Sequence, residues 1–288
     1  MAGRMNGKVV LVTGAAKGQG RSHAVRLAEE GADIIAVDIC EQLETVNHVM
    51  GTPADLAETV RLIEALDRRV VAGAADVRDR AALTAFVDSA VAELGHLDVV
   101  VANAGISPIG PDIEMMAWFE TVGTNLSGVV NTLQAAYPHL QSGASIVCIG
   151  SMAAMMPGSM DSPSAGPGAS GYGYAKQSVA RLVHNLALNL APRSIRVNAV
   201  HPGNIDTDML QNESMYRLFR PDLENPTRED AQPAFGSMHK IPVQTLDPRD
   251  ISEAVLFLAS DGARYVTGAQ LRVDAGALLT SMTSGAPA

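Results

Sequence analysis

The chain has 288 residues, of which 47% are hydrophobic and 4% are aromatic. This length accommodates one large α/β domain or two small ones, and it can bury a sizeable core without disulfide or metal staples. The formal charge of −10, from 31 acidic and 21 basic residues, argues against nucleic acid as a main partner because nothing would offset phosphate repulsion.

No export or membrane signal is visible. The apolar run Val9–Val12 is too short for a signal peptide and lacks a cleavage site, and no run approaches the ~20 apolar residues that span a bilayer. Cys40 and Cys148 each lie at or inside an apolar strand-like run, which is typical of buried thiols in a reduced compartment. The sequence therefore predicts a cytoplasmic protein.

Short apolar runs alternate with helical patterns along the chain, which predicts parallel strands covered by helices on both faces. Right-handed crossovers between such units give a single-domain, Rossmann-type doubly wound sheet of about seven strands. The predicted strands are Val9–Val12, Ile34–Val37, Val70–Ala74, Val99–Ala102, Ile146–Ile149, Arg196–Val200 and Gln270–Val273.

Capping residues mark the ends of several predicted helices. The predicted helices run from about Gly20 to Gly31, from the Thr52–Asp55 cap onward, from Asp79 to Gly95, and from about Ser170 to Ala191, where Pro192 stops the last. Two irregular segments, Met152–Gly171 and Gly203–Gln244, follow strands on the side where open α/β sheets bind ligands. They are the predicted substrate loops.

A glycine-rich turn, Thr13–Gly20, joins the first strand to the first helix with the spacing G-x-x-x-G-x-G. Glycines let the backbone approach a pyrophosphate, and the helix N-terminus supplies free N–H groups. Such a turn can also be purely structural. Asp38, at the end of the second strand, favours the first interpretation because its carboxylate can accept hydrogen bonds from an adenosine ribose.

Asp38 also predicts NAD rather than NADP, since it would repel a 2′-phosphate. Lys17 argues the other way, and Asp38 could be an ordinary solvated residue; we give more weight to Asp38 because it lies at the ribose itself. Two later strand ends, Asp76-Val77 and Asn103-Ala104-Gly105, can border the adenine and the crevice of the sheet. The predicted cofactor contacts in this half are Gly14, Lys17, Gly18, Gln19, Gly20, Asp38, Ile39, Asp76, Val77, Asn103, Ala104 and Gly105.

Tyr172 and Lys176 are one helical turn apart, so both side chains lie on one face of the predicted helix. A nearby ammonium stabilises phenolate over phenol, and Tyr172 is predicted to act as a base with its pKa well below the ordinary ~10. A lone Y-x-x-x-K can also be an ordinary exposed pair. Tyr174 points to another face of the helix.

Together, TGAAKGQG, Asp76, ANAG at Ala102–Gly105, Asn125, Ser151, YGYAK at Tyr172–Lys176 and the stretch from Pro202 to Thr207 resemble the short-chain dehydrogenase/reductase family. The resemblance runs from about Gly7 to Gly276. It implies a catalytic tetrad of Asn125, Ser151, Tyr172 and Lys176, with no metal. Ser151 would hydrogen-bond the substrate oxygen, Lys176 would hold the nicotinamide ribose, and Asn125, in a helix, would anchor a water leading to solvent.

The same resemblance places Ile205 and Thr207 beside the nicotinamide carboxamide, although Thr207 could also cap the helix that follows. It makes residues 203–244 a lid over the substrate in one domain covering residues 1–288, and it implies a homotetramer. The stretch Gly18–Cys40 and the extra stretch Glu41–Asp55 resemble the carveol-dehydrogenase-like subgroup. In that subgroup NAD(H) is thought to stay bound and to be recycled by the redox peptide mycofactocin.

Ser151 and Tyr172 are 21 residues apart, more than in much of the family, and the residues between them are rich in methionine. These methionines could line an adaptable apolar pocket, or they could pack on the body or on another subunit, as could the apolar side chains of the later loop. Those residues are Met152, Met155, Met156, Met160, Met209, Leu210, Met215, Tyr216, Leu218, Phe219, Phe235 and Met238.

The leading prediction is a NAD-dependent alcohol dehydrogenase or ketoreductase for an apolar secondary alcohol or ketone, terpenoid- or steroid-like. One alternative is an ordinary family member that exchanges NAD freely and acts on a polar alcohol or a 3-oxoacyl substrate. Another is a NAD-sensing protein without catalysis, which would usually lack Tyr172 or Lys176. The seven histidines lack the spacing of metal ligands.

Overall fold

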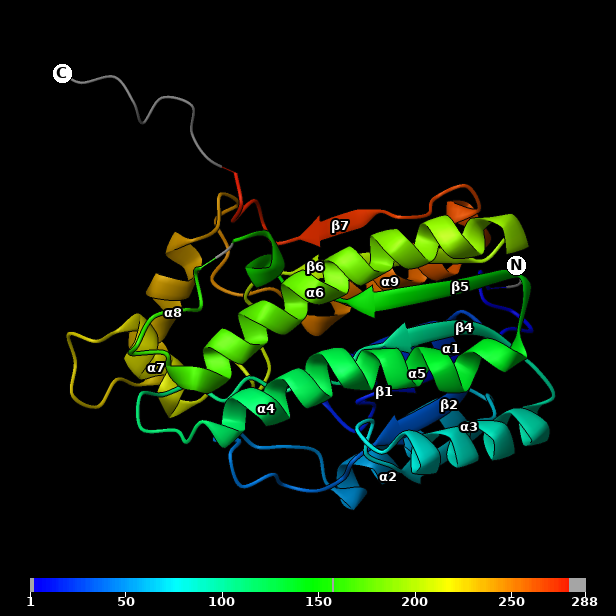
Figure 1. The fold of residues 1–288 in the computed structure, drawn as a ribbon, viewed down its shortest axis with the longest axis horizontal. Coiled ribbons are helices and arrows are strands. Elements are labelled where there is room, and N and C mark those ends of the chain that lie inside the picture. Colours follow the sequence, from blue (N-terminus) through cyan, green and yellow to red (C-terminus); the bar gives the residue numbers. More distant parts are fainter. Residues whose placement is uncertain (1–2, 157, 280–288) are drawn as a thin grey trace.

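The computed structural model describes residues 3–156 and 158–279. Seven parallel strands form one sheet in the order β3-β2-β1-β4-β5-β6-β7 (Figure 1). All seven predicted strands are confirmed, as is the doubly wound α/β fold. The strands are β1 (Val9–Thr13), β2 (Asp33–Asp38), β3 (Val70–Ala74), β4 (Leu97–Ala102), β5 (Leu140–Ile149), β6 (Arg196–Pro202) and β7 (Gln270–Val273).

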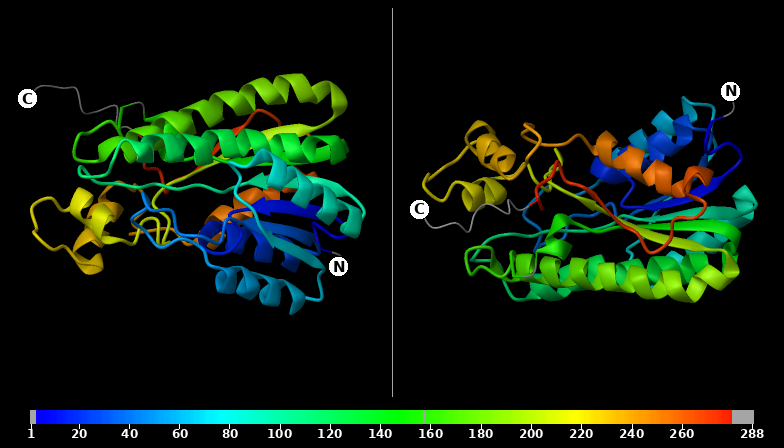
Figure 2. Two further views of the ribbon diagram at one scale, coloured as in Figure 1. Left: turned by 60° about the horizontal axis from the view of Figure 1, so that its bottom comes forward. Right: turned by 90° about the horizontal axis from the view of Figure 1, so that it is seen from above.

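Helices cover both faces of this sheet, as the two turned views show (Figure 2). One layer contains α3 (Arg80–Leu94), α4 (Met116–Val122), α5 (Gly128–Ala136) and the long α6 (Gly166–Leu190). The other contains α1 (Gly18–Glu29), α2 (Pro53–Glu64) and α9 (Pro248–Ala259). Each layer has its own apolar core against the sheet. None of the helices in residues 3–156 and 158–279 is long and apolar enough to cross a membrane.

The predicted helix ends are largely confirmed. Thr52 and Asp55 form a reciprocal capping box at α2, and Asp79 caps α3. Gly31 and Gly95 follow their helices with φ of +101° and +98°, a conformation that favours glycine. Helix α6 begins at Gly166, four residues before the predicted start, because Pro167 stands in its first turn, where its missing N–H is not needed.

The carboxyl ends of the strands point toward α7 (Glu213–Phe219) and α8 (Arg228–Ser237), which extend beyond the sheet (Figure 1). The predicted loop Gly203–Gln244 therefore contains two helices. The segment after β5 begins with a short 3₁₀ turn, Met152–Met155. Pro157, within the other predicted loop, and the ends of the predicted domain, residues 1–2 and 280–288, lie outside the described residues.

Both cysteines are free thiols. Cys148 is fully buried in β5, and burial raises its pKa to about 12. Cys40 is half-buried at the end of β2, and burial, aided by the charge of Asp38, raises its pKa to about 11. Neither is the thiolate that reactive cysteine chemistry requires.

Candidate active site

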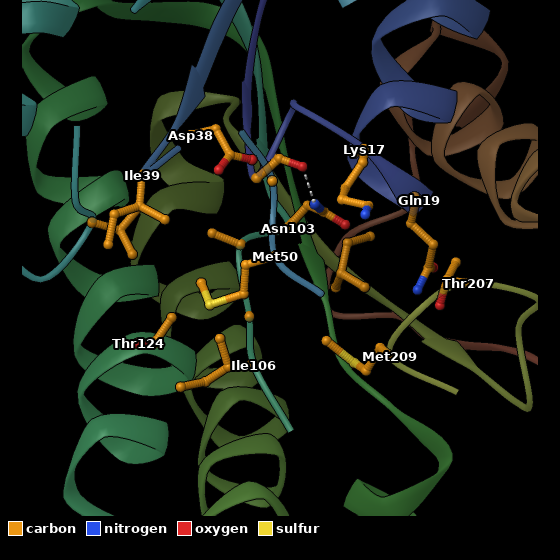
Figure 3. Close-up of a pocket in the computed structure, with 18 of the residues that line it drawn as sticks. Lys17, Gln19, Asp38, Ile39, Met50, Asn103, Ile106, Thr124, Thr207 and Met209 are labelled. Carbon is orange, nitrogen blue, oxygen red and sulfur yellow. Dashed lines mark hydrogen bonds between the residues drawn. The ribbon is translucent and has the colours of Figure 1, made fainter. Parts of the chain in front are cut away.

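A cleft along the carboxyl ends of β1, β2 and β4 holds the predicted cofactor residues. Its empty space is about 1080 Å³, the open mouth included. Asp38 and Ile39 lie at one end, and Gln19 and Thr207 at the other (Figure 3). The predicted contacts that line it are Gly14, Lys17, Gly18, Gln19, Gly20, Asp38, Ile39, Asp76, Val77, Asn103, Ala104, Gly105, Tyr172, Lys176 and Thr207. Ile205 lines the neighbouring pocket instead.

The glycine turn has room for a ligand on one side only. A Cβ on Gly14 would lie 2.9 Å from Ala104, and one on Gly20 would lie 1.8 Å from the Gly14 carbonyl oxygen, so the turn packs directly on the β4 end. A Cβ on Gly18 would meet nothing nearer than Thr207, at 3.5 Å. The 12-residue helix α1 begins at this open side. The turn therefore fits a diphosphate at the helix N-terminus.

Asp38 is held in place by backbone amides. Its carboxylate accepts hydrogen bonds from the amide nitrogens of Ala16, at 3.0 Å, and Cys40, at 3.1 Å. Lys17, which could have paired with a 2′-phosphate, instead forms an ion pair with Asp208 of the lid at 2.5 Å. The free lone pairs of the Asp38 carboxylate therefore remain available to ribose hydroxyls.

The other strand ends divide between binding and scaffolding. The Asn103 amide donates to the Thr13 carbonyl oxygen at 2.8 Å, which fastens the glycine turn to β4. The Asp76 carboxylate accepts from the backbone and guanidinium of Arg78, and Arg78 also lies 3.5 Å from Glu120. Asn103 and Asp76 therefore border the cleft with side chains that these contacts hold in place.

Residues 40–51, which we call the strap, form a wall of the cleft, and none of them is among the predicted cofactor contacts. Its lining side chains include Met50, which lies between the two ends of the cleft (Figure 3). The available signal was the extra length between β2 and α2, within the stretch Glu41–Asp55. The strap residues that line the cleft are Leu43, His48, Val49, Met50 and Gly51.

Side-chain hydrogen bonds hold the strap across the cleft. The Asn47 amide nitrogen donates to the Ile109 carbonyl oxygen and to Ser214 Oγ, both at 2.6 Å, and its Oδ1 accepts from the Ile109 amide at 3.3 Å. Thr45 hydrogen-bonds Glu120 of α4. Because Ser214 belongs to α7, one strap residue joins the β4–α4 loop to the lid.

Tyr172 and Lys176 lie on one face of α6, as predicted. Lys176 Nζ is 5.6 Å from the Tyr172 ring centre and donates to the Ile149 carbonyl oxygen at 2.8 Å. The lysine is 3% exposed, and burial lowers its pKa to about 8. Tyr174 is 54% exposed and packs against Trp118, so it lies outside the site.

Ser151 follows the last residue of β5 by two positions, and its hydroxyl faces Tyr172. Its Oγ accepts from the Ala153 amide at 3.1 Å. The predicted low pKa of Tyr172 is not found: burial raises the pKa above its ordinary value, and a hydrogen bond from Ser151 only partly lowers it. Desolvation outweighs the ammonium because Lys176 Nζ is directed to the Ile149 carbonyl rather than to the phenol oxygen.

Asn125 belongs to a π-helical turn, Gly123–Ser127, between α4 and α5. Its amide pairs with the Ile106 backbone, accepting from the nitrogen and donating to the oxygen at 2.8 Å each. A Cβ on Gly105 would lie 3.2 Å from Asn125 Oδ1 and 3.7 Å from Lys176 Nζ, which places both side chains behind Gly105. The predicted helical setting is confirmed, whereas the water relay stays a prediction.

A second pocket, the substrate chamber, adjoins the cleft. Gln19, Gly150, Tyr172, Thr207 and Met209 line both. Among the described residues no charged side chain lines the chamber. The apolar side chains predicted to line it, and found there, are Met152, Met156, Met160, Met209, Leu210, Met215, Leu218, Phe219 and Met238.

Three of the predicted apolar residues do not line the chamber: Met155, which is half-buried, and Tyr216 and Phe235 of the later loop. Tyr216 and Phe235 pack with Phe219 inside the lid and do not line the chamber. Thr207 does not cap the next helix: α7 begins after Asn212, whose side chain accepts from the Met215 amide. The Thr207 side chain is therefore free to face the cleft.

Comparison with known proteins agrees with this fold. A family model described as enoyl-(acyl carrier protein) reductase matches residues 14–277. A short-chain type dehydrogenase/reductase of Mycolicibacterium smegmatis is 52% identical over 97% of this chain and 100% of its own length. The (−)-trans-carveol dehydrogenase of Rhodococcus erythropolis is 45% identical over 96% of this chain and 99% of its own.

Among solved structures, carveol dehydrogenase from Mycobacterium avium in complex with NAD superposes with a TM-score of 0.90. It is 49% identical and covers 96% of this chain and 100% of its own. The chain therefore belongs to the short-chain dehydrogenase/reductase family of oxidoreductases.

Proposed function

We propose that the protein is a NAD-dependent alcohol dehydrogenase or ketoreductase acting on an apolar secondary alcohol or ketone. The observation that carries this proposal is the place of Tyr172, which lines both the cofactor cleft and the uncharged substrate chamber. An alcohol bound in the chamber must lose a hydride to the cofactor and a proton to a base at the same carbinol group. The junction of the two pockets is where both transfers can take place, and Tyr172 lies there. Membership in the family and the likeness to carveol dehydrogenases support it.

NAD, when bound, would accept the hydride. The Gly14–Gly20 turn would hold its diphosphate, Asp38 its adenosine ribose, Asp76-Val77 its adenine side, and Thr207 with Ile205 its carboxamide. The Asp38 carboxylate would repel a 2′-phosphate, and Lys17 is paired with Asp208. We therefore assign NAD rather than NADP.

The residues divide the chemistry between them. Tyr172 takes the proton of the substrate hydroxyl as the carbon loses its hydride. Ser151 donates its one O–H to the substrate oxygen and lies within hydrogen-bond reach of the Tyr172 oxygen. Lys176 Nζ, 5.6 Å from the Tyr172 ring centre, stabilises the phenolate through its charge and not by a hydrogen bond, and a proton leaves past Lys176 and Asn125. In the reductive direction each of these transfers is reversed.

The walls of the chamber select for substrates without charge. Six methionines line it, and polarisable, unbranched side chains adapt to bulky apolar molecules of varied shape. A phosphate or carboxylate there would lie next to no described cationic side chain, so its desolvation would be uncompensated. This composition favours a terpenoid- or steroid-like alcohol over a polar alcohol or a charged 3-oxoacyl thioester.

A panel of secondary alcohols tests the substrate class. We expect kcat/KM to be at least about 100-fold higher for a cyclic terpenoid alcohol than for a small polar alcohol of equal reactivity, because burying several extra methylenes is worth several kcal/mol. Rates are measured with NAD and an artificial electron acceptor. Higher kcat/KM for polar or 3-oxoacyl substrates would favour the alternative function.

We further propose that NAD(H) stays bound and is recycled by an external carrier such as mycofactocin. The strap crosses the cleft, and Asn47 fastens it to both the β4–α4 loop and α7. Release of a dinucleotide beneath it requires these hydrogen bonds to break. Ordinary exchange of free NAD is the alternative.

Asn47→Ala is expected to raise the rate of NAD release at least about 10-fold, because three hydrogen bonds worth about 1 kcal/mol each are lost. Release is followed after gel filtration, with NAD measured in the denatured protein. Asn185→Ala, on the exposed face of α6, is the matched control. If wild-type protein loses its NAD(H) on simple dilution, retention and carrier recycling are both wrong.

We also propose a cytoplasmic homotetramer. Large apolar side chains are exposed along α4 and α6, where a further subunit would bury them. They are Met115, Met116, Phe119, Tyr174 and Leu188. Light scattering of the purified protein measures the native mass against the 30.1 kDa chain.

A further inference from the structure

His201 lies in β6 directly behind the catalytic serine and is fully buried. Its Nδ1 is 3.2 Å from the Ser151 amide nitrogen and 3.0 Å from the Ser151 carbonyl oxygen. A Cβ on Gly150 would lie 2.4 Å from Nδ1. The imidazole therefore packs against the turn that delivers Ser151 from β5, and only glycine before the serine leaves room for it.

The other ring nitrogen is engaged too. His201 Nε2 is 2.7 Å from Gln270 Oε1, and Gln270 Nε2 donates to the Ala180 carbonyl oxygen at 3.1 Å. Since the Gln270 NH₂ group faces a carbonyl, its Oε1 must accept from an Nε2–H of the imidazole. A neutral ring then has an unprotonated Nδ1, which accepts from the Ser151 N–H.

This chain of hydrogen bonds links the turn that carries Ser151 to helix α6, which carries Tyr172. Ala180 lies on α6 two turns beyond Tyr172, and Ser151 lies at the end of β5. Burial lowers the pKa of His201 by more than its hydrogen bonds to Gln270 and Ser151 raise it, and the charge of Lys176 lowers it further, which favours the neutral ring. The ring is thus a fixed acceptor that sets the Ser151 backbone relative to the helix carrying Tyr172.

We propose that His201 is a positioning residue for the reaction: through Nδ1 it holds the Ser151 backbone so that the serine hydroxyl meets both the Tyr172 oxygen and the substrate oxygen. It touches neither substrate nor cofactor, since it lines neither pocket. The inference rests on the proposed function, because it assigns a role only if Ser151 and Tyr172 are catalytic.

Two replacements separate positioning from folding. In His201→Asn the amide oxygen can take the place of Nδ1 and accept from Ser151, whereas in His201→Gln the amide reaches the Nε2 position and leaves the Ser151 N–H without its acceptor. We expect kcat to fall about 10- to 100-fold in His201→Gln and within about 3-fold in His201→Asn, since small misplacements of a reacting group are costly. KM should change by less than about 3-fold in both. Thermal unfolding of each variant shows whether its fold is retained.

If His201 acts by positioning Ser151, its replacement should lower kcat only while the serine hydroxyl is present. In a Ser151→Ala background, His201→Gln should lower kcat by less than about 2-fold further, since coupled residues are non-additive. Equal loss in both backgrounds, or loss of kcat in proportion to stability in both replacements, would overturn the proposal.

Gln270→Glu keeps the imidazole itself but removes the donor to the Ala180 carbonyl oxygen. A carboxylate beside Nε2 favours the doubly protonated ring, whose Nδ1–H would donate to the Ser151 carbonyl instead of accepting from its N–H. Lys176 is the other charged group that acts on the ring. We expect kcat to fall on acidification at a pH about one unit or more higher than in the wild type; an unchanged pH profile counts against positioning. If Tyr172→Phe leaves turnover intact, the proposed function fails; if it abolishes turnover and the His201 variants are normal, only this inference fails.

Discussion

Tyr172→Phe is expected to lower kcat for alcohol oxidation by about 10³-fold, because removal of a positioned general base typically costs 10²–10⁴-fold. The ring remains, so the packing of α6 and the wall of the cleft are kept. NAD binding, followed by fluorescence or calorimetry, should change by less than about 3-fold. Such a pattern assigns the phenol oxygen to chemistry and not to cofactor binding.

Tyr174→Phe is the matched control, two residues away on the same helix. Its hydroxyl lies outside both pockets and its ring packs against Trp118. Its kcat should equal that of the wild type within about 2-fold. Wild-type turnover in Tyr172→Phe would rule out this mechanism, whereas NAD binding without turnover of any alcohol in the wild type would favour the NAD-sensing alternative.

Lys176→Met is expected to lower kcat by about 10³-fold and also to weaken NAD binding, because one ammonium serves the phenolate and the nicotinamide ribose. The methionine keeps the length of the side chain but neither donates a hydrogen bond nor bears charge. Steady-state kinetics with Lys240→Met, an exposed lysine, as control measure the effect. Unchanged kcat with weaker NAD binding would limit Lys176 to the cofactor.

The same variant has a pH signature in stability. Burial lowers the pKa of Lys176 from 10.5 to about 8. Between those pH values the unfolded chain binds more protons than the folded one, so this lysine makes the free energy of unfolding rise with pH there, by up to about 3 kcal/mol. Below pH 8 both states are protonated and the contribution levels off. Denaturation of the cofactor-free protein at pH 8 and at pH 10 should show a rise in the free energy of unfolding that is smaller in Lys176→Met than in the wild type. Equal rises would mean that burial does not lower the pKa of Lys176.

Most of the frame could be predicted from residue patterns because each signal is local. Four-residue apolar runs predicted the strands, and Thr52, Asp79 and Gly95 marked helix ends through hydrogen bonds within one turn. The start of α6 was placed too late because Gly166 and Pro167 are typical of loops as well as of a first helical turn. Helices α7 and α8 were missed because α7 spans only seven residues and α8 contains Pro233.

The attachment of the strap and the raised pKa of Tyr172 could be found only from the folded structure. Sequence spacing indicated that Lys176 lies near the phenol, but the direction of its Nζ toward Ile149 depends on β5, a distant strand. Likewise the extra length after β2 was visible, whereas its attachment through Asn47 joins residues 62 and 167 positions away. Contacts of this range have no periodic trace in the sequence.

The sequence by itself determined the seven strands in chain order, the helices α1, α2, α3 and α6, the glycine turn, the Tyr172–Lys176 pair and the acidic residue at the end of β2. Backbone geometry and short-range hydrogen bonding act between near neighbours, so these signals are local. Only the tertiary structure decided that Tyr172 stands between two pockets, that none of the side chains lining the substrate chamber in residues 3–156 and 158–279 is charged, and that His201 packs behind Ser151. Those features arise where the carboxyl ends of parallel strands meet, and burial there sets the protonation of each group through desolvation.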